Sequence, residues 1–135
     1  MNNLPFYPKP ELVTKELCYS FKKLFFAKHL GQQDVDKIIG SMIKKRFKAG
    51  DHIIRYGDQG KSYYVLMQGN VKVVVYNDGV SPFDPKLDTK IKFTKMMQAP
   101  VGFGEIALLY NDKRTASIFA EDDCEAYELD GKLFK

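Results

Sequence analysis

The sequence predicts an α+β fold, in which N-terminal helices pack on an antiparallel β-roll or jelly-roll barrel. Two observations predict it: apolar residues recur at helical spacing before residue 47, and short β-rich runs separated by turn residues follow. Many short strands with turns between them favour a sandwich or barrel over a parallel sheet. We therefore divide the chain into a helical segment at 1–46, a β-roll at 47–130 and the start of a C-terminal helix at 131–135.

Two stretches before residue 47 carry the helical pattern. The first covers residues 11–30 and ends before Gly31. Its apolar residues are Leu12, Val13, Leu17, Phe21, Leu24 and Phe25. The second has the apolar residues Val35, Ile38, Ile39, Met42 and Ile43. An apolar stripe on one helix face is typical of a packing surface, so we expect neither stretch to bind a cofactor.

Positive charge is concentrated at the N-terminal end of the chain. Residues 1–50 hold ten basic and four acidic side chains, a balance of +6, whereas residues 51–135 have a balance of −2. The basic triplet at 44–46 could contact nucleic acid or an anionic membrane. The interpretation that we favour is the solvated C-terminal end of the second helix, where cations suit the negative pole of the helix dipole.

Beyond residue 47 the pattern changes to short strands and turns. Strands are expected at 52–55, 62–68, 71–76, 89–95, 115–120 and 124–129. The glycine within residues 68–70 is placed as in a tight hairpin turn. Residues 77–88 form a polar loop that is longer than most hairpin connections, and a tolerated surface insertion explains it more readily than a partner-binding loop.

Length and composition are those of one ordinary globular domain. The chain has 135 residues, of which 44% are hydrophobic and 28% are charged. Cys18 and Cys124 lie far apart without metal-site spacing, so we expect two free thiols in a reducing compartment. The N-terminus lacks the blocks of a signal peptide, and no apolar run could span a bilayer. We expect a cytoplasmic protein without a membrane or nucleic-acid partner.

The segment from residue 103 to residue 116 carries the candidate chemistry. Gly104 would let the backbone approach a ligand closely, and a helix beginning near Glu105 would offer N–H groups to a phosphate. Arg114 could present its guanidinium fork to the same phosphate, and the Glu105 carboxylate could accept sugar hydroxyls. An anion site beside a sugar site is one interpretation. A structural ion pair between Glu105 and Arg114 is the other, and the residue pattern alone leaves both open.

Phe-Gly-Glu-Ile-Ala-Leu-Leu-Tyr-Asn at 103–111, with Arg-Thr-Ala at 114–116, resembles the phosphate-binding cassette of cyclic-nucleotide-binding domains. The likeness runs from about residue 17 to residue 134 and is closest to the regulatory domains of cyclic-nucleotide-dependent protein kinases. Pro100 departs from the family, which often has glycine there. The family's C-terminal helices, which form a lid over the base, are expected to be truncated in this chain at Lys135.

The resemblance implies that the short helix binds phosphate and gives seven residues a role. They are Gly104, Glu105, Ile106, Ala107, Arg114, Thr115 and Ala116. Glu105 would accept a hydrogen bond from the ribose 2′-hydroxyl, and Arg114 would pair with the exocyclic phosphate. Backbone N–H groups at Ile106, Ala107 and Ala116 would add donors to that phosphate. Arg-Thr-Ala at 114–116 resembles the sequence of cGMP-dependent kinases, whereas cAMP-dependent kinases usually carry alanine after the arginine. The hydroxyl of Thr115 can bridge the phosphate and the amino group of a guanine in the syn conformation. We therefore expect cGMP to be favoured over cAMP, unless Thr115 only fills a strand position.

The function that this resemblance implies is a regulatory binding module and not an enzyme, with no cofactor and no metal. It would belong to a cyclic-nucleotide-dependent protein kinase or its regulatory subunit, with a kinase catalytic domain as partner in cis or in trans. The alternatives are a cAMP-binding regulatory subunit and the sensor domain of a channel or transcription factor. A cupin-like metal enzyme is a remote alternative, because His29 and His52 are the only histidines available as ligands.

Overall fold

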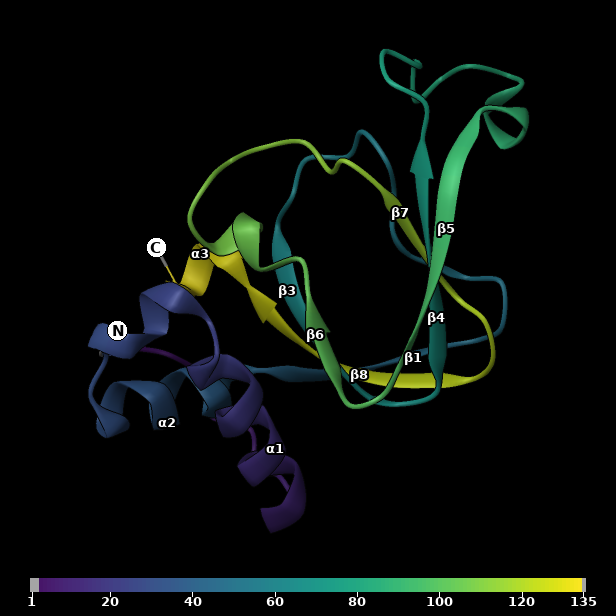
Figure 1. Cartoon of the computed structure of the whole chain (residues 1–135). Coiled ribbons are helices and arrows are strands. Elements are labelled where there is room, and N and C mark those ends of the chain that lie inside the picture. The colour runs from purple at the N-terminus through teal and green to yellow at the C-terminus, as the bar shows by residue number, and fades with distance from the viewer. Residues whose placement is uncertain (1–2, 135) are drawn as a thin grey trace.

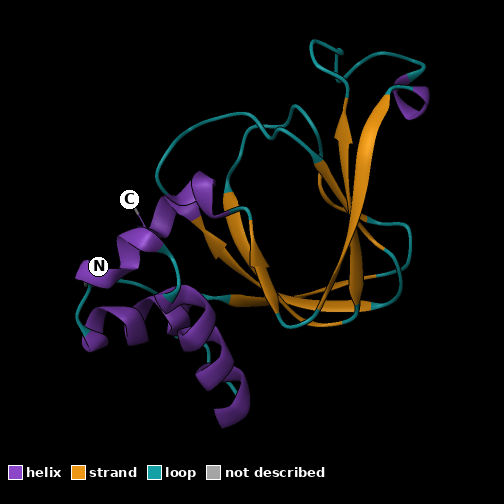
Figure 2. Cartoon of the chain, in the orientation of Figure 1, coloured by secondary structure: helices purple, strands orange, loops and turns teal. Residues whose placement is uncertain are grey.

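The computed structural model describes residues 3–134 and shows the α-helices gathered at one end of a β-roll (Figures 1 and 2). The α-helices are α1 (Glu11–Lys22), α2 (Gln32–Ser41) and α3 (Gly131–Phe134). The 3₁₀ helices are η1 (Phe25–His29), η2 (Leu87–Thr89) and η3 (Glu105–Leu108). The strands are β1 (Ile43–Phe47), β2 (His52–Ile54), β3 (Ser62–Gln68), β4 (Asn70–Tyr76), β5 (Ile91–Gln98), β6 (Val101–Phe103), β7 (Ser117–Ala120) and β8 (Cys124–Asp130).

The strands form two four-stranded sheets, in the orders β1-β8-β3-β6 and β2-β7-β4-β5. All the strand pairs within them are antiparallel, so the predicted α+β fold with an antiparallel β-roll is confirmed. The hairpin predicted at residues 68–70 is wrong, because β3 and β4 belong to different sheets. Gly69, at φ +102°, connects them, and a Cβ there would lie 2.7 Å from both Asp123 O and Cys124 Sγ. This crossing places the two sheets face to face.

The first helical stretch is broken where the periodicity predicted continuity. α1 ends at Lys22, Leu24 is extended at ψ 132°, and η1 begins at Phe25. The break lets the rings of Phe21 and Phe26 meet edge-on, with centroids 6.4 Å apart. Tertiary packing of the aromatic side chains therefore overrides the helical pattern between residues 23 and 30.

The basic triplet at 44–46 lies in β1, which corrects its assignment to the end of a helix. α2 ends at Ser41, and the sheet begins at Ile43, whose side chain is exposed. β1 pairs with β8, which supplies the acidic partners: Glu125 lies 3.2 Å from Lys44 and 3.3 Å from Arg46, and Glu128 lies 3.7 Å from Lys45. These cross-strand charge pairs stabilise β1 at the edge of its sheet. A short basic run by itself does not indicate that it lies in a strand.

The buried side chains form two clusters. One joins the helices to the outer face of the β1-β8-β3-β6 sheet and includes Phe21, Ile38, Tyr63 and Leu129; Leu108 of η3 belongs to it. The other fills the space between the sheets and includes Leu66, Val71, Ile118 and Ala126. Because Leu108 anchors η3 in the helical cluster, the segment after Gly104 is held between the helices and the β-roll.

Several strand boundaries differ from those predicted. β5 runs from Ile91 to Gln98 rather than from residue 89 to 95, and β6 was not predicted at all. The Ala99–Pro100 peptide bond between these strands is cis. Both cysteines are free, as predicted, and Cys124 is buried. Within residues 3–134, no helix combines the length and apolar character needed to cross a membrane.

Candidate functional site

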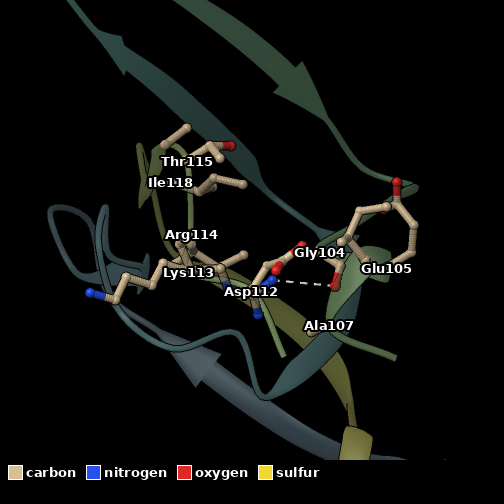
Figure 3. A pocket seen from close by; sticks show the side chains of 11 residues that line it. Gly104, Glu105, Ala107, Asp112, Lys113, Arg114, Thr115 and Ile118 are labelled. Atoms are coloured by element: carbon tan, nitrogen blue, oxygen red, sulfur yellow. Dashed lines mark hydrogen bonds between the residues drawn. The ribbon is translucent and has the colours of Figure 1, made fainter. Parts of the chain in front are cut away.

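One cavity of about 260 Å³ brings together all seven predicted site residues (Figure 3). It opens between η3 and the segment that leads into β7. Glu105 and Arg114, nine positions apart in the sequence, therefore line the same cavity. Its further lining residues, which the sequence did not single out, are Ile54, Asp112, Lys113 and Ile118. The two isoleucines belong to apolar runs in β2 and β7, and their pattern indicates burial, not a site.

Gly104 is the joint between β6 and η3. Its backbone is left-handed, at φ +82° and ψ 16°, a conformation that glycine adopts without steric cost. A Cβ at this position would lie 3.0 Å from both Arg114 Nη1 and Ser62 O. The glycine is therefore needed twice, once for the turn and once for the approach of the guanidinium.

η3 is a four-residue 3₁₀ helix, Glu105–Leu108, so the short helix predicted near Glu105 is present. Ala107 and Leu108 are buried, whereas the side chain of Ile106 is 46% exposed and Glu105 is half-buried. The N–H of Ala107 already donates to Gly104 O at 3.2 Å. The short helix therefore turns its apolar side to the core and leaves Glu105 beside the cavity.

Arg114 is a half-buried cation that forms no ion pair within residues 3–134. Its Nη1 donates to Gly104 O at 3.3 Å, as the dashed line in Figure 3 shows, and its Nη2 donates to Ser62 O. In the part of the chain that the structure describes, no carboxylate forms an ion pair with it. The alternative of a Glu105–Arg114 ion pair is therefore not what the structure shows.

Burial lowers the pKa of Arg114 below its ordinary value, and the nearby Glu105 and Asp58 carboxylates oppose that effect. The guanidinium nevertheless remains charged, because its ordinary pKa lies far above neutrality. A charge that is partly removed from water without a counter-ion is costly in free energy. An anion that enters the cavity can therefore form a strong ion pair with the Arg114 guanidinium.

The main chain around Arg114 is held by the turn at residues 57–60. Gly57 N–H donates to Arg114 O at 2.9 Å, and Arg114 N–H donates to Asp58 O at 2.7 Å. Gly60 N–H donates to Asp112 O at 2.9 Å, and Gln59 forms a bridge with Lys113. This short ladder fixes the position from which the arginine side chain reaches Gly104.

A second hollow of about 220 Å³ lies on the other side of Arg114 and includes Tyr64 and Glu128. Tyr64 Oη donates to Glu128 Oε2 at 2.9 Å. Burial, with the nearby Glu128 carboxylate, raises the pKa of Tyr64, so the phenol stays neutral. Sequence reasoning missed both residues, because each has the appearance of an ordinary strand position.

A family model described as cyclic nucleotide-binding domain matches residues 44–135. The chain belongs to this family. The match begins at the second residue of β1, within the last residues of the predicted helical segment, and covers the cavity-lining residues. The resemblance read from residues 103–116 is thereby confirmed.

Curated relatives of this cyclic nucleotide-binding domain are regulatory subunits. The chain is 29% identical over 134 residues to the cAMP-dependent protein kinase regulatory subunit of Dictyostelium discoideum, covering 98% of this chain and 38% of that protein. It is 32% identical over 134 residues to the cAMP-dependent protein kinase regulatory subunit of Hypocrea atroviridis, covering 97% of this chain and 28% of that protein. The chain therefore spans about a third of the length of these relatives.

Solved structures agree with the fold. A structure described as cAMP-bound PfPKA-R superimposes with a TM-score of 0.78 at 28% identity, covering 98% of this chain and 44% of that one. The regulatory domain of Toxoplasma gondii PKA with cAMP gives a TM-score of 0.74 at 27% identity, covering 95% and 45%. These matches support the prediction of a regulatory binding domain rather than an enzyme, since the relatives are regulatory subunits.

Replacing Gly104 by alanine should disturb both the turn and the arginine. The added Cβ meets Arg114 Nη1 and Ser62 O at 3.0 Å, and the left-handed backbone costs a non-glycine residue about 1–2 kcal/mol. We expect the melting temperature to fall by several degrees. Thermal unfolding of Gly104→Ala beside Gly79→Ala measures this, because Gly79 is also left-handed, at φ +75°, but has nothing within 4 Å of its would-be Cβ. Equal losses in the two variants would contradict a steric role at Gly104.

Proposed function

We propose that the cavity between η3 and β7 binds a cyclic nucleotide, with the phosphate at Arg114 and the ribose at Glu105. The observation that carries the proposal is the half-buried guanidinium of Arg114, which lines the same cavity as Glu105 and, among the described residues, bonds only to carbonyl oxygens. A monoanionic phosphate supplies the missing counter-charge through charge-assisted hydrogen bonds. The separate carboxylate is then free to accept a sugar hydroxyl.

The remaining site residues suit the same ligand. Ile106, Ala107 and Ala116 line the cavity, and the absence of a Cβ at Gly104 lets Arg114 approach closely beside the phosphate position. Ala107 N–H has only a 3.2 Å bond to Gly104 O, so exchanging this bond for one to a phosphate oxygen would cost little. Ile54 and Ile118 supply apolar contact beyond the sugar.

The proposed ligand is cGMP in preference to cAMP. Thr115 lines the cavity, is exposed and precedes β7, so its hydroxyl could bond a guanine amino group. The second candidate is cAMP, which the descriptions of the most similar regulatory subunits and structures favour.

The proposed role of the whole protein is to regulate a protein kinase in the cytoplasm. The support is the family and the regulatory subunits that the chain resembles, which imply a kinase catalytic domain as partner. The mechanism would be allosteric: nucleotide binds better to one arrangement of the cassette and so shifts the population towards it.

Isothermal titration of the 135-residue chain with cAMP and cGMP, side by side, tests the proposal. We expect one binding event for each nucleotide, with the lower Kd for cGMP. Absence of heat with either nucleotide at millimolar concentration would overturn the binding function. A lower Kd for cAMP would overturn only the preference.

Thr115→Ala should penalise cGMP more than cAMP. Loss of one hydrogen bond to the guanine amino group corresponds to about 0.5–1.5 kcal/mol, which is a two- to tenfold rise in the Kd for cGMP. The Kd for cAMP should change less, since adenine has no amino group at that position. Titration of both nucleotides measures the ratio, with Thr14→Ala on α1 as the matched control. An equal rise for both nucleotides would contradict the selectivity role.

A further inference from the structure

The long loop between β4 and β5 is tied to the turn that carries Arg114. It projects from one end of the β-roll, above β4 and β5 in Figure 1. Its base is closed by Asn77 N–H donating to Lys90 O at 2.8 Å. Asp84 accepts from Lys86 N–H at 2.8 Å and forms an ion pair with Lys90 at 2.5 Å. The loop therefore has internal bonds of its own, which a tolerated insertion does not require.

This loop contacts Gly57, the first residue of the 57–60 turn that holds the main chain of Arg114, and Tyr56, the residue before it. Tyr56 Oη donates to Val80 O, and the Tyr56 ring lies 5.1 Å from that of Tyr76, the last residue of β4. Pro82 packs so closely on Gly57 that a Cβ at the glycine would overlap the proline ring. The loop thus packs against one side of the turn at 57–60.

The same two residues bond to the strand that follows Arg114. Tyr56 N–H donates to Ser117 Oγ at 3.0 Å, and Gly57 N–H donates to Arg114 O at 2.9 Å. Ser117 is buried and also lies 3.4 Å from the Tyr76 hydroxyl. Tyr56 and Gly57 therefore lie between the loop and Arg114, bonded or packed on both sides.

We propose that the 77–90 loop positions Arg114 for the phosphate, and that Tyr56 is the positioning residue through which it acts. The inference rests on the proposed binding of a cyclic nucleotide. The loop lines none of the cavity, so its effect on affinity must pass through the 57–60 turn. A guanidinium aimed at an anion loses much of its value when its main chain can shift, because charge-assisted bonds depend on geometry.

Two variants test the inference. Tyr56→Phe keeps the ring and removes the hydroxyl bonded to Val80. The second variant replaces residues 78–89 by Asn-Gly, a pair that closes two-residue hairpins between strands such as β4 and β5. We expect each to raise the Kd for cGMP and cAMP about three- to tenfold, the loss of roughly one hydrogen bond. Tyr19→Phe, on α1, and Phe83→Ser, at an exposed loop position, are the matched controls and should bind as the parent chain does.

A double-mutant cycle with Arg114→Ala separates positioning from general damage. If the loop acts through the arginine, Tyr56→Phe should have no further effect on the Kd once Arg114 is alanine. A loss that is as large in the Arg114→Ala background would overturn the inference, as would unchanged Kd values in both variants. Failure of the parent chain to bind either nucleotide would instead overturn the proposed function, so the two failures are distinguishable.

Discussion

Arg114→Ala should weaken binding of a cyclic nucleotide by about 2–5 kcal/mol, which corresponds to a rise in Kd of about 30- to 4,000-fold. The expectation follows from the burial of the guanidinium and from the lack of a carboxylate partner within residues 3–134. The phosphate would keep its desolvation cost in the cavity and lose its guanidinium partner. Titration calorimetry gives the Kd directly.

Two further variants sharpen the result for the arginine. Arg114→Lys keeps the charge but loses the fork that bonds Gly104 O and Ser62 O together, so an intermediate Kd is expected. Arg46→Ala is the matched control, since its side chain is 74% exposed and pairs with Glu125 on β8. Circular dichroism establishes that each variant is folded. A folded Arg114→Ala chain with the parent's Kd would refute the phosphate site.

The sequence predicted which residues share one cavity better than it predicted the secondary structure around them. The cassette at 103–116 combines a glycine, a carboxylate and an arginine at fixed spacing, and all seven residues do line one cavity. The basic triplet at 44–46 was misplaced because its acidic partners, Glu125 and Glu128, lie some eighty residues further along the chain. A local pattern cannot show which strand will supply a counter-charge.

The hairpin predicted at Gly69 was wrong for a related reason. A glycine between two strand-like runs is compatible with a hairpin and with a crossing between sheets, and only the packing against Asp123 and Cys124 distinguishes them. The role of the 77–90 loop was equally invisible, because Tyr56 and Pro82 meet only in the folded chain. Tertiary contacts thus decide what local turn signals leave open.

Glu105→Ala should weaken the binding free energy of the cyclic nucleotide by about 1.5–3 kcal/mol, the value of a hydrogen bond to a charged group. This loss corresponds to a rise in Kd of roughly 10- to 150-fold. Glu105 is half-buried at the start of η3, and within the described chain its carboxylate accepts no side-chain hydrogen bond and forms no ion pair. A carboxylate held beside the cavity without a partner is available to the ribose 2′-hydroxyl.

The 2′-deoxy analogue of the nucleotide tests that contact from the ligand side. For the parent chain, the Kd of the analogue should exceed that of the natural ligand by about the factor by which Glu105→Ala raises the Kd of the natural ligand. Glu105→Ala itself should bind the two ligands with equal Kd. Glu11→Ala, at a residue 82% exposed on α1, is the control for the loss of one negative charge. Equal affinity of the parent chain for the two ligands would contradict the ribose contact while leaving the phosphate site at Arg114 intact. The two halves of the pocket can therefore be tested independently, because the carboxylate and the guanidinium are not bonded to each other.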